Sequence, residues 1–433
     1  MKLHNLIHVL IGILCIGLLP RAQAVVPPPG GGYPNFTTAA GDHALQALTL
    51  GLGNTAIGTF SLFSVTTGNF NTAVGAGALD LNTADSNTAT GAAALLFNTT
   101  GTENTANGTA ALESNNIGNN NTATGAFALF NNTTGSRNTA IGANALVVNS
   151  TANENTAIGH AALELNTTGA ANTAIGVDAL VFNTMGGANA AIGEEALFSN
   201  TSGSSNTANG NAALLNNSTG NGNTAVGLGA LASNTAGNNN IGLGPNAGNS
   251  VTTANNVICI GAVPGANVNN TCFIGSIRGV TTINANALPV VIDSANQLGT
   301  MSSSRRFKHE IKLMNKASEA ILALKPVTFH YKSDNTDTPQ FGLIAEEVAE
   351  VNADLVVRDK DGEIYTVRYD AVNAMLLNEF LKEHRKVQEL EATVAQQHQD
   401  FEAAVAELKR QIQKVSAQLK LNKSAPQTVL NDQ

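Results

Sequence analysis

Apolar and polar positions recur along most of this chain with a period of seventeen residues. The unit reads Asn-Thr-Ala-aliphatic-Gly-x-x-Ala-Leu-x-x-Asn-Thr-Thr-Gly-x-x, and leucine holds its ninth position in twelve consecutive copies. The copies begin at Thr37, Asn54, Asn71, Asn87, Asn104, Asn121, Asn138, Asn155, Asn172, Asn189, Asn206 and Asn223, and degenerate copies follow up to residue 275. A fixed period of this length is typical of a stacked array, in which no unit buries its apolar residues alone.

The residue types of the unit predict a β-solenoid over residues 37–275. Thr, Asn, Gly and β-branched residues at this density oppose helix formation, and the two glycines of each unit indicate two turns. We expect one coil per unit, with short strands at Thr-Ala-aliphatic and at Ala-Leu-x-x. Alanine and leucine should point inward, and stacked Asn and Thr should form ladders along the axis. Disorder from low complexity is the alternative, but a disordered segment has no physical reason to keep the leucine register.

The Asn-Thr-Ala-Ile-Gly run of these repeats resembles the head repeats of trimeric autotransporter adhesins. The units here are longer than is usual in those heads. The resemblance implies a left-handed β-roll from each of three chains, packed around a common axis.

Beyond the repeats, two further patterns organise the chain. We expect two short strands joined by a turn, at residues 287–292 and 297–300. Together they would form a β collar over residues 276–301. A long helix is predicted over 371–421, because apolar residues recur with three-four spacing. They are Val387, Leu390 and Val394, then Phe401, Val405, Leu408, Ile412, Val415 and Leu419. The two runs differ in phase, as at a stutter, and they indicate a coiled coil over 386–421, followed by a disordered tail at 422–433.

The segment between collar and coiled coil, 302–385, carries four motifs in order. They are Ser303 to Lys308, 324–331, 341–348 and 365–369. Together they resemble the endosialidase-type intramolecular chaperone, the self-cleaving C-terminal peptidase domain of phage tailspikes and tail fibres. The resemblance covers roughly the last 130 residues. It implies an α+β domain that forms a homotrimer, directs folding of the fibre ahead of it, and then cuts itself off. The coiled coil would then be three-stranded.

The resemblance also implies a cleavage site. In that family a serine lies five residues before a lysine, and the cut falls just before the serine. Carried over to this chain, Ser303 is the nucleophile, Lys308 is the general base, and the scissile bond joins Ser302 to Ser303. The family commonly has aspartate where this chain has Ser304.

The chemistry of such a pair is sound on physical grounds. A serine hydroxyl is a weak nucleophile that needs an adjacent base, and Ser-Lys pairs are a variant of the catalytic triad. A lysine acts as a base only when neutral, which burial or a neighbouring cation favours. Arg305 and Arg306 could supply that cation. In the alternative interpretation, the serines cap an amphipathic helix that starts near Phe307.

Composition and charge bound the remaining possibilities. Gly is abundant at 42 residues, aromatic residues make up 4%, and Trp is absent, so conventional globular cores are not expected. Residues 25–289 contain only two basic residues against ten acidic ones. Such a surface repels nucleic acid and anionic membranes.

The first residues predict export. Lys2, the apolar stretch 6–19 and the small residues before Ala24 are typical of a secretory signal over 1–24, cleaved after Ala24. A retained anchor is the alternative, but about 14 apolar residues are too short to span a bilayer, and we expect no integral membrane segment after cleavage. Residues 25–36 predict a Pro/Gly linker without secondary structure. The protein should therefore be secreted or held at the cell surface.

Other residues that suggest chemistry have ordinary structural explanations. Glu346 and Glu347 should lie on the solvated face of a helix over 343–351, and residues 359–362 should form a hairpin turn rather than a calcium loop. Four histidines, His309, His330, His384 and His398, lack metal-ligand spacing. We therefore expect no metal and no cofactor. Cys259 and Cys272 differ by one in their offset from the following glycine. In strands they should face opposite ways, so we expect two small core residues rather than a disulfide.

These predictions describe an exported homotrimeric fibre or adhesin-like protein with a self-releasing chaperone. Its rod would bind an unidentified surface or glycan ligand. The same fibre with an uncleaved trimerisation clamp is one alternative. A polysaccharide-degrading, tailspike-like enzyme is another, but the linker, coils and collar fill residues 25–300 and leave no room for a catalytic domain. We expect no enzyme activity on external substrates.

Overall fold

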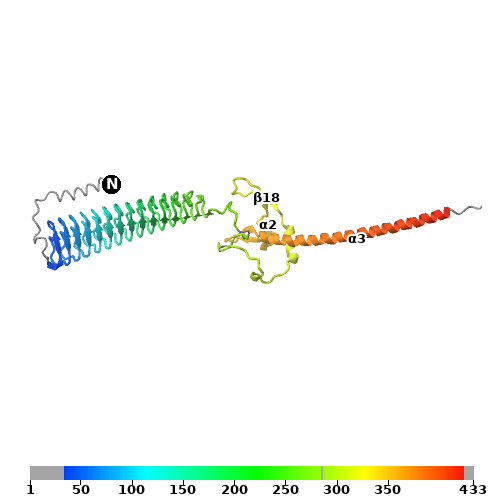
Figure 1. Cartoon of the computed structure of the whole chain (residues 1–433), viewed down its shortest axis with the longest axis horizontal. Helices are drawn as coiled ribbons and strands as arrows, with labels where there is room; N and C mark the ends of the chain where they lie inside the picture. Colours follow the sequence, from blue (N-terminus) through cyan, green and yellow to red (C-terminus); the bar gives the residue numbers. More distant parts are fainter. Residues whose placement is uncertain (1–33, 284–285, 424–433) are drawn as a thin grey trace, which may run out of the picture. The chain divides into compact units, whose positions relative to one another are not determined.

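The computed structural model describes residues 34–283 and 286–423, which belong to two compact units divided between Thr281 and Thr282 (Figure 1). The predicted signal segment, 1–24, lies outside the described residues. So does most of the linker, and so does the predicted tail apart from its first two residues, which are helical. The end of the linker forms a 3-10 turn, η1 (Pro34–Phe36), where we expected no element. Asn35 is left-handed there, at φ 68°, a conformation that asparagine tolerates.

Unit 1 is one parallel sheet of fifteen three-residue strands, in which each strand pairs with its sequence neighbours. The strands are β1 (Thr38–Ala40), β2 (Thr55–Ile57), β3 (Thr72–Val74), β4 (Thr88–Thr90), β5 (Thr105–Asn107), β6 (Thr122–Thr124), β7 (Thr139–Ile141), β8 (Thr156–Ile158), β9 (Thr173–Ile175), β10 (Ala190–Ile192), β11 (Thr207–Asn209), β12 (Thr224–Val226), β13 (Ile241–Leu243), β14 (Ile258–Ile260) and β15 (Cys272–Ile274). Equivalent residues of successive copies pair in register, and the coils stack as a ladder (Figure 1). The predicted β-solenoid of about fourteen coils is confirmed.

The second strand that we predicted in each coil does not form. The Ala-Leu segment is a turn instead, and its leucine adopts positive φ, as at Leu129 with 51°. The turn closes when the amide of Asn132 donates to the carbonyl of Leu129 at 3.1 Å. The amide of Leu129 also donates to the carbonyl of Ala145 in the next coil, at 2.9 Å. A seventeen-residue coil must return on itself, so this segment bends where a strand would run straight.

The inward-facing residues of the solenoid form one continuous core, as predicted. The strand alanine and the Ala-Leu pair are fully buried in most coils, for example Ala123, Ala128 and Leu129. Left-handed backbone at a leucine costs roughly 1–2 kcal/mol. Burying its side chain contributes about 1.5–3 kcal/mol, which offsets that cost.

Two columns of buried asparagine run beside this core and confirm the predicted asparagine ladders. In the first column, the backbone amide of Asn138 donates to Oδ1 of Asn121 at 3.0 Å. In the second, Nδ2 of Asn132 donates to Oδ1 of Asn115 at 2.8 Å and to the carbonyl of Gly135 at 2.9 Å. Buried amides need such partners, because an unpaired one costs about 1–3 kcal/mol. Several threonines of the coil donate to a backbone carbonyl of the next coil instead, as Thr133 does to Ser150.

Two positions of the coil are usually glycine, and the structure shows a constraint on each. Gly125 follows its strand at φ 135°, a conformation that side chains rarely adopt. Gly118 has no such angle, but a Cβ on it would lie 2.3 Å from the carbonyl oxygen of Gly135 in the next coil. The first glycine therefore permits the turn and also the close approach of Gly142 in the next coil, whereas the second is needed only for close stacking.

The two cysteines face opposite ways, as their offsets predicted, but only one belongs to the core. Cys259 is fully buried, whereas Cys272 is exposed on β15, and both are free thiols. The register explains the difference, because Cys259 pairs with Phe273 and Cys272 pairs with Ile258. The expectation that both are buried is wrong for Cys272, because its position in the coil is an outward one.

Unit 2 combines three small strand pairs with short helices and one long helix. The antiparallel pairs are β16 (Val291–Ile292) with β17 (Leu298–Gly299), β18 (Val327–Phe329) with β19 (Gln340–Gly342), and β20 (Val356–Arg358) with β21 (Ile364–Val367). The helices are η2 (Arg305–Phe307), η3 (Asn315–Ala323), α2 (Ala345–Val351), η4 (Ala353–Leu355) and α3 (Tyr369–Lys423). The predicted strand–turn–strand at 287–300, the hairpin turn at 359–362 and the long C-terminal helix are all present.

The apolar core of unit 2 is small. Its buried members are Val348, Leu355, Val367 and Met375, from α2, η4, β21 and α3. The apolar stripe of α3 beyond these residues is exposed, as at Leu408 and Ile412. Within the described residues, no helix is long and apolar enough to cross a membrane.

Candidate functional site

A single helical turn shapes the segment that carries the predicted cleavage site. The amide of Phe307 donates to the carbonyl of Ser304 at 3.0 Å, and the amide of Lys308 donates to that of Arg305 at 3.1 Å. This turn, η2, folds the chain back over the five-residue spacing. Lys308 Nζ consequently donates a hydrogen bond to Ser303 Oγ at 2.9 Å. The structure thus brings the predicted nucleophile and the predicted base together.

The pair has the geometry that proton transfer requires. A base must lie within about 2.6–3.2 Å of the atom whose proton it takes, and the Ser303–Lys308 distance falls inside that range. Both side chains are exposed in the single chain, as is Ser302 on the other side of the predicted scissile bond. Water exclusion around the lysine would therefore have to come from another chain or from closure of this segment.

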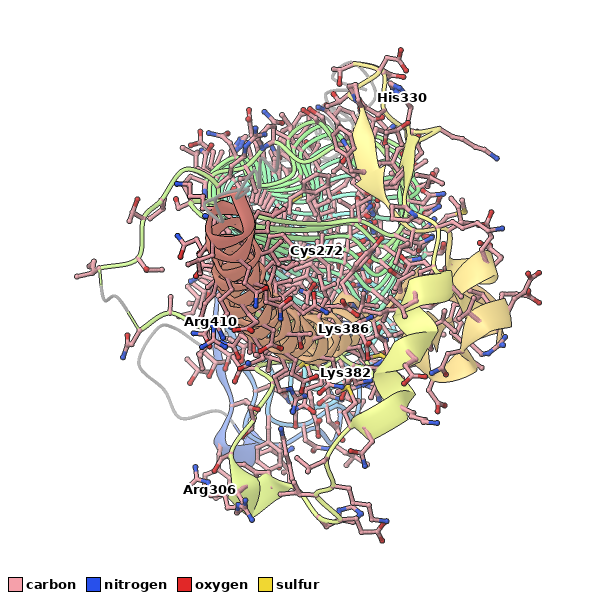
Figure 2. All side chains as sticks on the ribbon, turned by 90° about the vertical axis from the view of Figure 1, so that its right-hand side faces the viewer. Cys272, Arg306, His330, Lys382, Lys386 and Arg410 are labelled. Atoms are coloured by element: carbon pink, nitrogen blue, oxygen red, sulfur yellow. The ribbon has the colours of Figure 1, made fainter. Side chains whose placement is uncertain are left out.

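The two arginines are placed less closely. The guanidinium of Arg306 stacks over the ring of Phe307 at 4.6 Å, and its side chain projects from the η2 turn (Figure 2). Arg305 takes part in the turn through its backbone carbonyl. Within the described part of the chain, no polar contact joins either guanidinium to Ser303 or Lys308. The cationic neighbourhood that we expected from them stays a prediction.

The helix-capping interpretation of the serines is not supported. Ser304 precedes only the single turn of η2, and its side chain makes no capping hydrogen bond. Residues 308–314 do not continue as a helix. The apolar residues of that stretch, Phe307 and Ile311, are exposed and have no core on which an amphipathic helix could pack.

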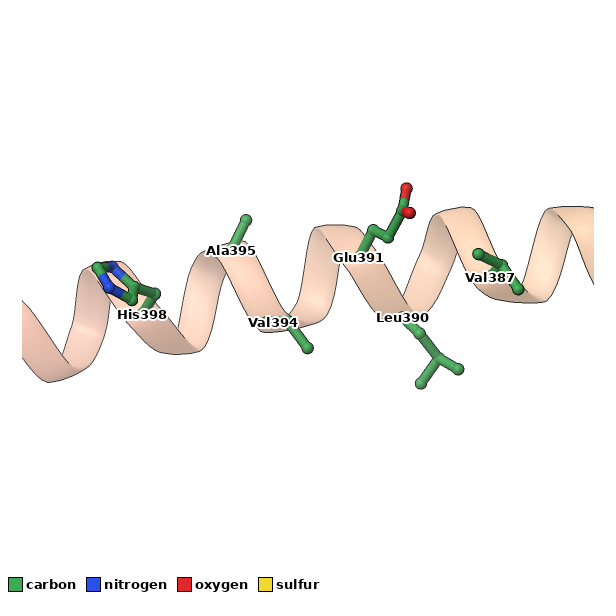
Figure 3. A pocket seen from close by; sticks show the side chains of 6 residues that line it. All are labelled: Val387, Leu390, Glu391, Val394, Ala395 and His398. Carbon is green, nitrogen blue, oxygen red and sulfur yellow. The ribbon is translucent and has the colours of Figure 1, made fainter.

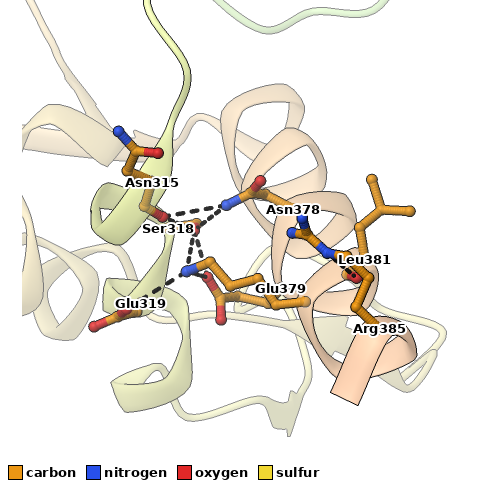
Figure 4. A network of polar contacts seen from close by, with 8 residues as sticks. Asn315, Ser318, Glu319, Asn378, Glu379, Leu381 and Arg385 are labelled. Atoms are coloured by element: carbon orange, nitrogen blue, oxygen red, sulfur yellow. Dashed lines mark hydrogen bonds and ion pairs between the residues drawn. The ribbon is translucent and has the colours of Figure 1, made fainter. Parts of the chain in front are cut away.

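A polar cluster that sequence reasoning missed docks η3 on α3 (Figure 4). Ser318 is fully buried and hydrogen-bonds to the carboxylate of Glu379, which also accepts from Lys382 Nζ at 2.7 Å. Asn378 Nδ2 donates to Ser318 Oγ at 2.6 Å. The hydrogen bonds from Lys382 and Ser318 lower the pKa of Glu379, and the bond to Glu379 raises the pKa of Lys382. The partners are about sixty residues apart, so no sequence spacing could indicate them.

The other residues considered from the sequence have structural roles. Glu346 and Glu347 are exposed in the first turn of α2, which confirms the solvated face. His330 pairs with Asp337 at 2.9 Å in the β18–β19 loop (Figure 2). Nowhere in residues 34–283 and 286–423 do three or more His, Cys, Asp or Glu side chains gather as metal ligands.

A surface hollow lies on α3, lined by Val387, Leu390, Glu391, Val394, Ala395 and His398 (Figure 3). All six residues belong to one helix, so the hollow has no opposite wall and suits a neighbouring helix better than a small molecule. Val387, Leu390 and Val394 are exposed there, and they start the apolar stripe.

Comparison with known proteins supports the C-terminal resemblance. Residues 303–357 match the family model described as chaperone of endosialidase. The match begins at Ser303 and takes in η2, η3, the β18–β19 pair and α2, so it confirms the resemblance of this region. No curated protein matches the chain, and no solved structure matches it.

Proposed function

We propose that this chain is an exported homotrimeric fibre or adhesin-like surface protein. Its C-terminal domain, 302–385, would act as an intramolecular trimerisation chaperone and be released by self-cleavage between Ser302 and Ser303. The observation that carries the proposal is the 2.9 Å contact between Ser303 Oγ and Lys308 Nζ, at the start of the region that matches the chaperone family. The β-solenoid of unit 1 would be the fibre that the domain assembles.

The cleavage chemistry can be written so that all atoms balance. Ser303 Oγ attacks the carbonyl carbon of Ser302, and its proton passes to the neutral amine of Lys308. The peptide C–N bond breaks, the proton moves from Lys308 to the new amino group of Ser303, and an ester joins the two residues. Water then hydrolyses the ester, which leaves a carboxylate on Ser302 and restores the Ser303 hydroxyl. No cofactor takes part.

The exposed apolar stripe of α3 supports association of copies of this chain. Phe401, Ile412 and Leu419 are each at least 60% exposed in the single chain. A stripe with three-four spacing is covered when helices of several chains pack together. Three chains are proposed because the family resemblance implies a homotrimer.

The outward strand face of the rod is uncharged. Its outward strand positions, second and fourth in each coil, carry threonine and mostly aliphatic residues, such as Ile141, Ile158 and Ile192. All ten acidic residues of the repeats lie at other positions of the coil. Copies of an acidic rod repel each other, so they would meet most easily through this face.

Localisation outside the cell rests on the predicted signal over 1–24, which the structure does not describe, and on the fibre-like family of the C-terminal domain. An acidic rod gives no support to a nucleic-acid partner. A surface or glycan ligand of the rod stays a prediction without an assigned site.

Terminal sequencing of the expressed full chain tests the proposal. We expect a fragment that starts at Ser303 in the parent and none in Ser303→Ala or Lys308→Ala. Lys312→Ala serves as the matched control, because Lys312 is an exposed lysine of the same segment. An intact parent that is still trimeric by light scattering would favour the uncleaved clamp, and a monomer would remove the fibre proposal altogether.

A further inference from the structure

We propose that Ser318, Glu379 and Lys382 form a positioning network for self-cleavage. By docking η3 on α3, they would hold the reactive turn in the orientation in which Ser303 reaches the scissile carbonyl. This inference rests on the proposed function, because it names residues that act on the same site from a distance. None of the three touches the reacting atoms.

The polar groups of this network have hydrogen-bond partners, although the apolar core of unit 2 is small. Ser318 has no solvent exposure, and its hydroxyl contacts the Asn315 carbonyl at 3.1 Å as well as Glu379 and Asn378. Glu379 is 9% exposed. Lys382 Nζ reaches both Glu379 and Glu319, at 2.7 and 3.5 Å (Figure 4). A buried ion pair stabilises little compared with apolar packing, and its best-attested use is to specify one arrangement.

That arrangement is the placement of η3 along α3. The bonds from Asn378 and Lys382 to Ser318 and Glu319 span sixty to sixty-four residues of sequence. Hydrogen bonds of charged groups are directional and require a defined geometry on both elements. Apolar contacts of η3, made by Ala320 and Ile321, would tolerate some sliding on the helix, whereas this network tolerates little.

The reactive turn depends on η3 for its position. Ser318 is the first buried residue after Ser303, and every residue from Ser303 to Leu313 is exposed. In this described segment, residues 309–313 take part in no backbone hydrogen bond. Only six residues, 309–314, separate Lys308 from the start of η3. The nearest firm attachment of the reactive turn to the rest of unit 2 is therefore the docked η3.

Positioning matters for this chemistry because a displacement of the reacting groups by about 1 Å can slow a reaction roughly 100-fold. Releasing η3 would leave Ser303 and Lys308 chemically intact while the segment samples many orientations. Cleavage should then slow without loss of the long helix.

The test follows cleavage over time after cell-free synthesis of the full chain. We expect Glu379→Ala and Ser318→Ala to slow cleavage about 10- to 100-fold. Glu379→Gln should be cleaved faster than Glu379→Ala but more slowly than the parent, because its amide oxygen can still accept from Ser318 and Lys382. Glu383→Ala is the matched control on α3, since Glu383 is exposed and outside the network. Hydrogen exchange of η3 in the Ser303→Ala background reports docking in each variant.

The outcomes separate the inference from the proposed function. If the parent is cleaved and Ser303→Ala is not, the proposed function stands. The positioning role is then refuted if hydrogen exchange of η3 is rapid in Glu379→Ala but the variant is still cleaved at the parental rate. It is equally refuted if Glu379→Gln is as slow as Glu379→Ala while its η3 stays protected. If the parent itself is never cleaved, the proposed function has failed, and the positioning role fails with it.

Discussion

The solenoid of unit 1 and the C-terminal unit 2 satisfy their apolar residues in opposite ways. In the solenoid the leucine at the ninth position of each repeat is covered by neighbouring coils of the same chain, and Leu129 has no solvent exposure. In unit 2 the apolar stripe of α3 from Val387 onward remains exposed in the single chain, apart from the half-buried Val405. The first unit covers its core within one chain and exposes aliphatic residues only on its outward face, whereas the second leaves its longest element uncovered. We therefore expect association of copies to depend mainly on unit 2.

The difference also concerns polar groups. The solenoid buries neutral amides in ladders that repeat every coil, so no coil depends on one special contact. Unit 2 buries one charged network, and its partners come from two distant elements. A repeated neutral ladder builds length, and a single charged network defines one position.

The largest expected effect comes from charge in the stripe of α3. Leu408→Asp combined with Val415→Asp should abolish trimers, because the carboxylates would be buried at the helix seam without partners. Light scattering should show a threefold lower mass, with the β signal of the solenoid unchanged in circular dichroism. Ala403→Asp with Ala417→Asp, on the opposite face of α3, should leave the mass unchanged. Trimers in the first double variant would contradict the contrast between the two units.

The next effect concerns the core of the solenoid. Leu129→Ala should lower its stability by about 2–5 kcal/mol, because the cavity is enclosed by rigid coils. Thermal unfolding and hydrogen exchange of the adjacent coils measure the loss. The loss should not depend on protein concentration, since the contacts lie within one chain. Thr134→Ala, an exposed position in the same coil, should change stability by less than about 0.5 kcal/mol. A concentration-dependent loss for Leu129→Ala would mean that the core needs partner chains.

A smaller effect is an opposite response of the two units to pH. Burial raises the pKa of Glu113 to about 7 and that of Asp80 to about 6. Their folded-state pKa values exceed the unfolded ones, so the solenoid is most stable when both are protonated. It loses that stability as pH rises from about 4.5 through about 7. We expect a midpoint about 2–4 °C higher at pH 5 than at pH 8, or ~1 kcal/mol, because both carboxyls keep some solvent contact. Glu113→Gln should remove most of the difference.

Unit 2 should respond differently. The pKa of Glu379 is lowered by its bonds to Lys382 and Ser318, so its contribution is present above the ordinary carboxyl value of about 4.3 and is lost on further acidification. The pKa of Lys382 is raised, so its contribution persists until pH rises above the ordinary lysine value of about 10.4. Hydrogen exchange of η3 should therefore be constant from pH 5 to 8, after correction for intrinsic rates, and should accelerate only on acidification below about 4.3. If the unfolding midpoint of the solenoid is the same at pH 5 and pH 8 while η3 is released at pH 5, the two units respond in the opposite way to the one expected.

The smallest effect is expected at the solvated face of α2. Glu346→Gln should leave cleavage unchanged, because the side chain is exposed in the first helical turn. It should alter stability by at most about 1 kcal/mol, through the helix dipole. Terminal sequencing and thermal unfolding check both expectations. Loss of cleavage would place this carboxylate in the reaction.

Much of the solenoid could be predicted because its information is local and repeated. The Ala and Leu positions and the asparagine columns follow from one seventeen-residue pattern. The conformation of the Ala-Leu segment could not be predicted, because leucine rarely adopts the positive φ seen at Leu129. The exposure of Cys272 follows from its outward position on β15, where it pairs with Ile258 rather than with Cys259.

The candidate site divides in the same way. Its two reacting side chains lie five residues apart, and one turn is enough to bring Ser303 and Lys308 together. The cluster of Ser318, Glu379 and Lys382 joins residues about sixty positions apart, and no periodicity marks it.

By itself the sequence determined the repeat, its inward residues, the boundary between the solenoid and the charged C-terminal region, and the spacing of the Ser303–Lys308 pair. These features depend on residues that are near each other or that recur, so local chemistry and period are sufficient. Only the tertiary structure decided how each coil turns at its leucine, which carboxyls of the solenoid are desolvated, and how η3 docks on α3. These depend on contacts between distant residues, and their energies arise only when folding excludes water from them.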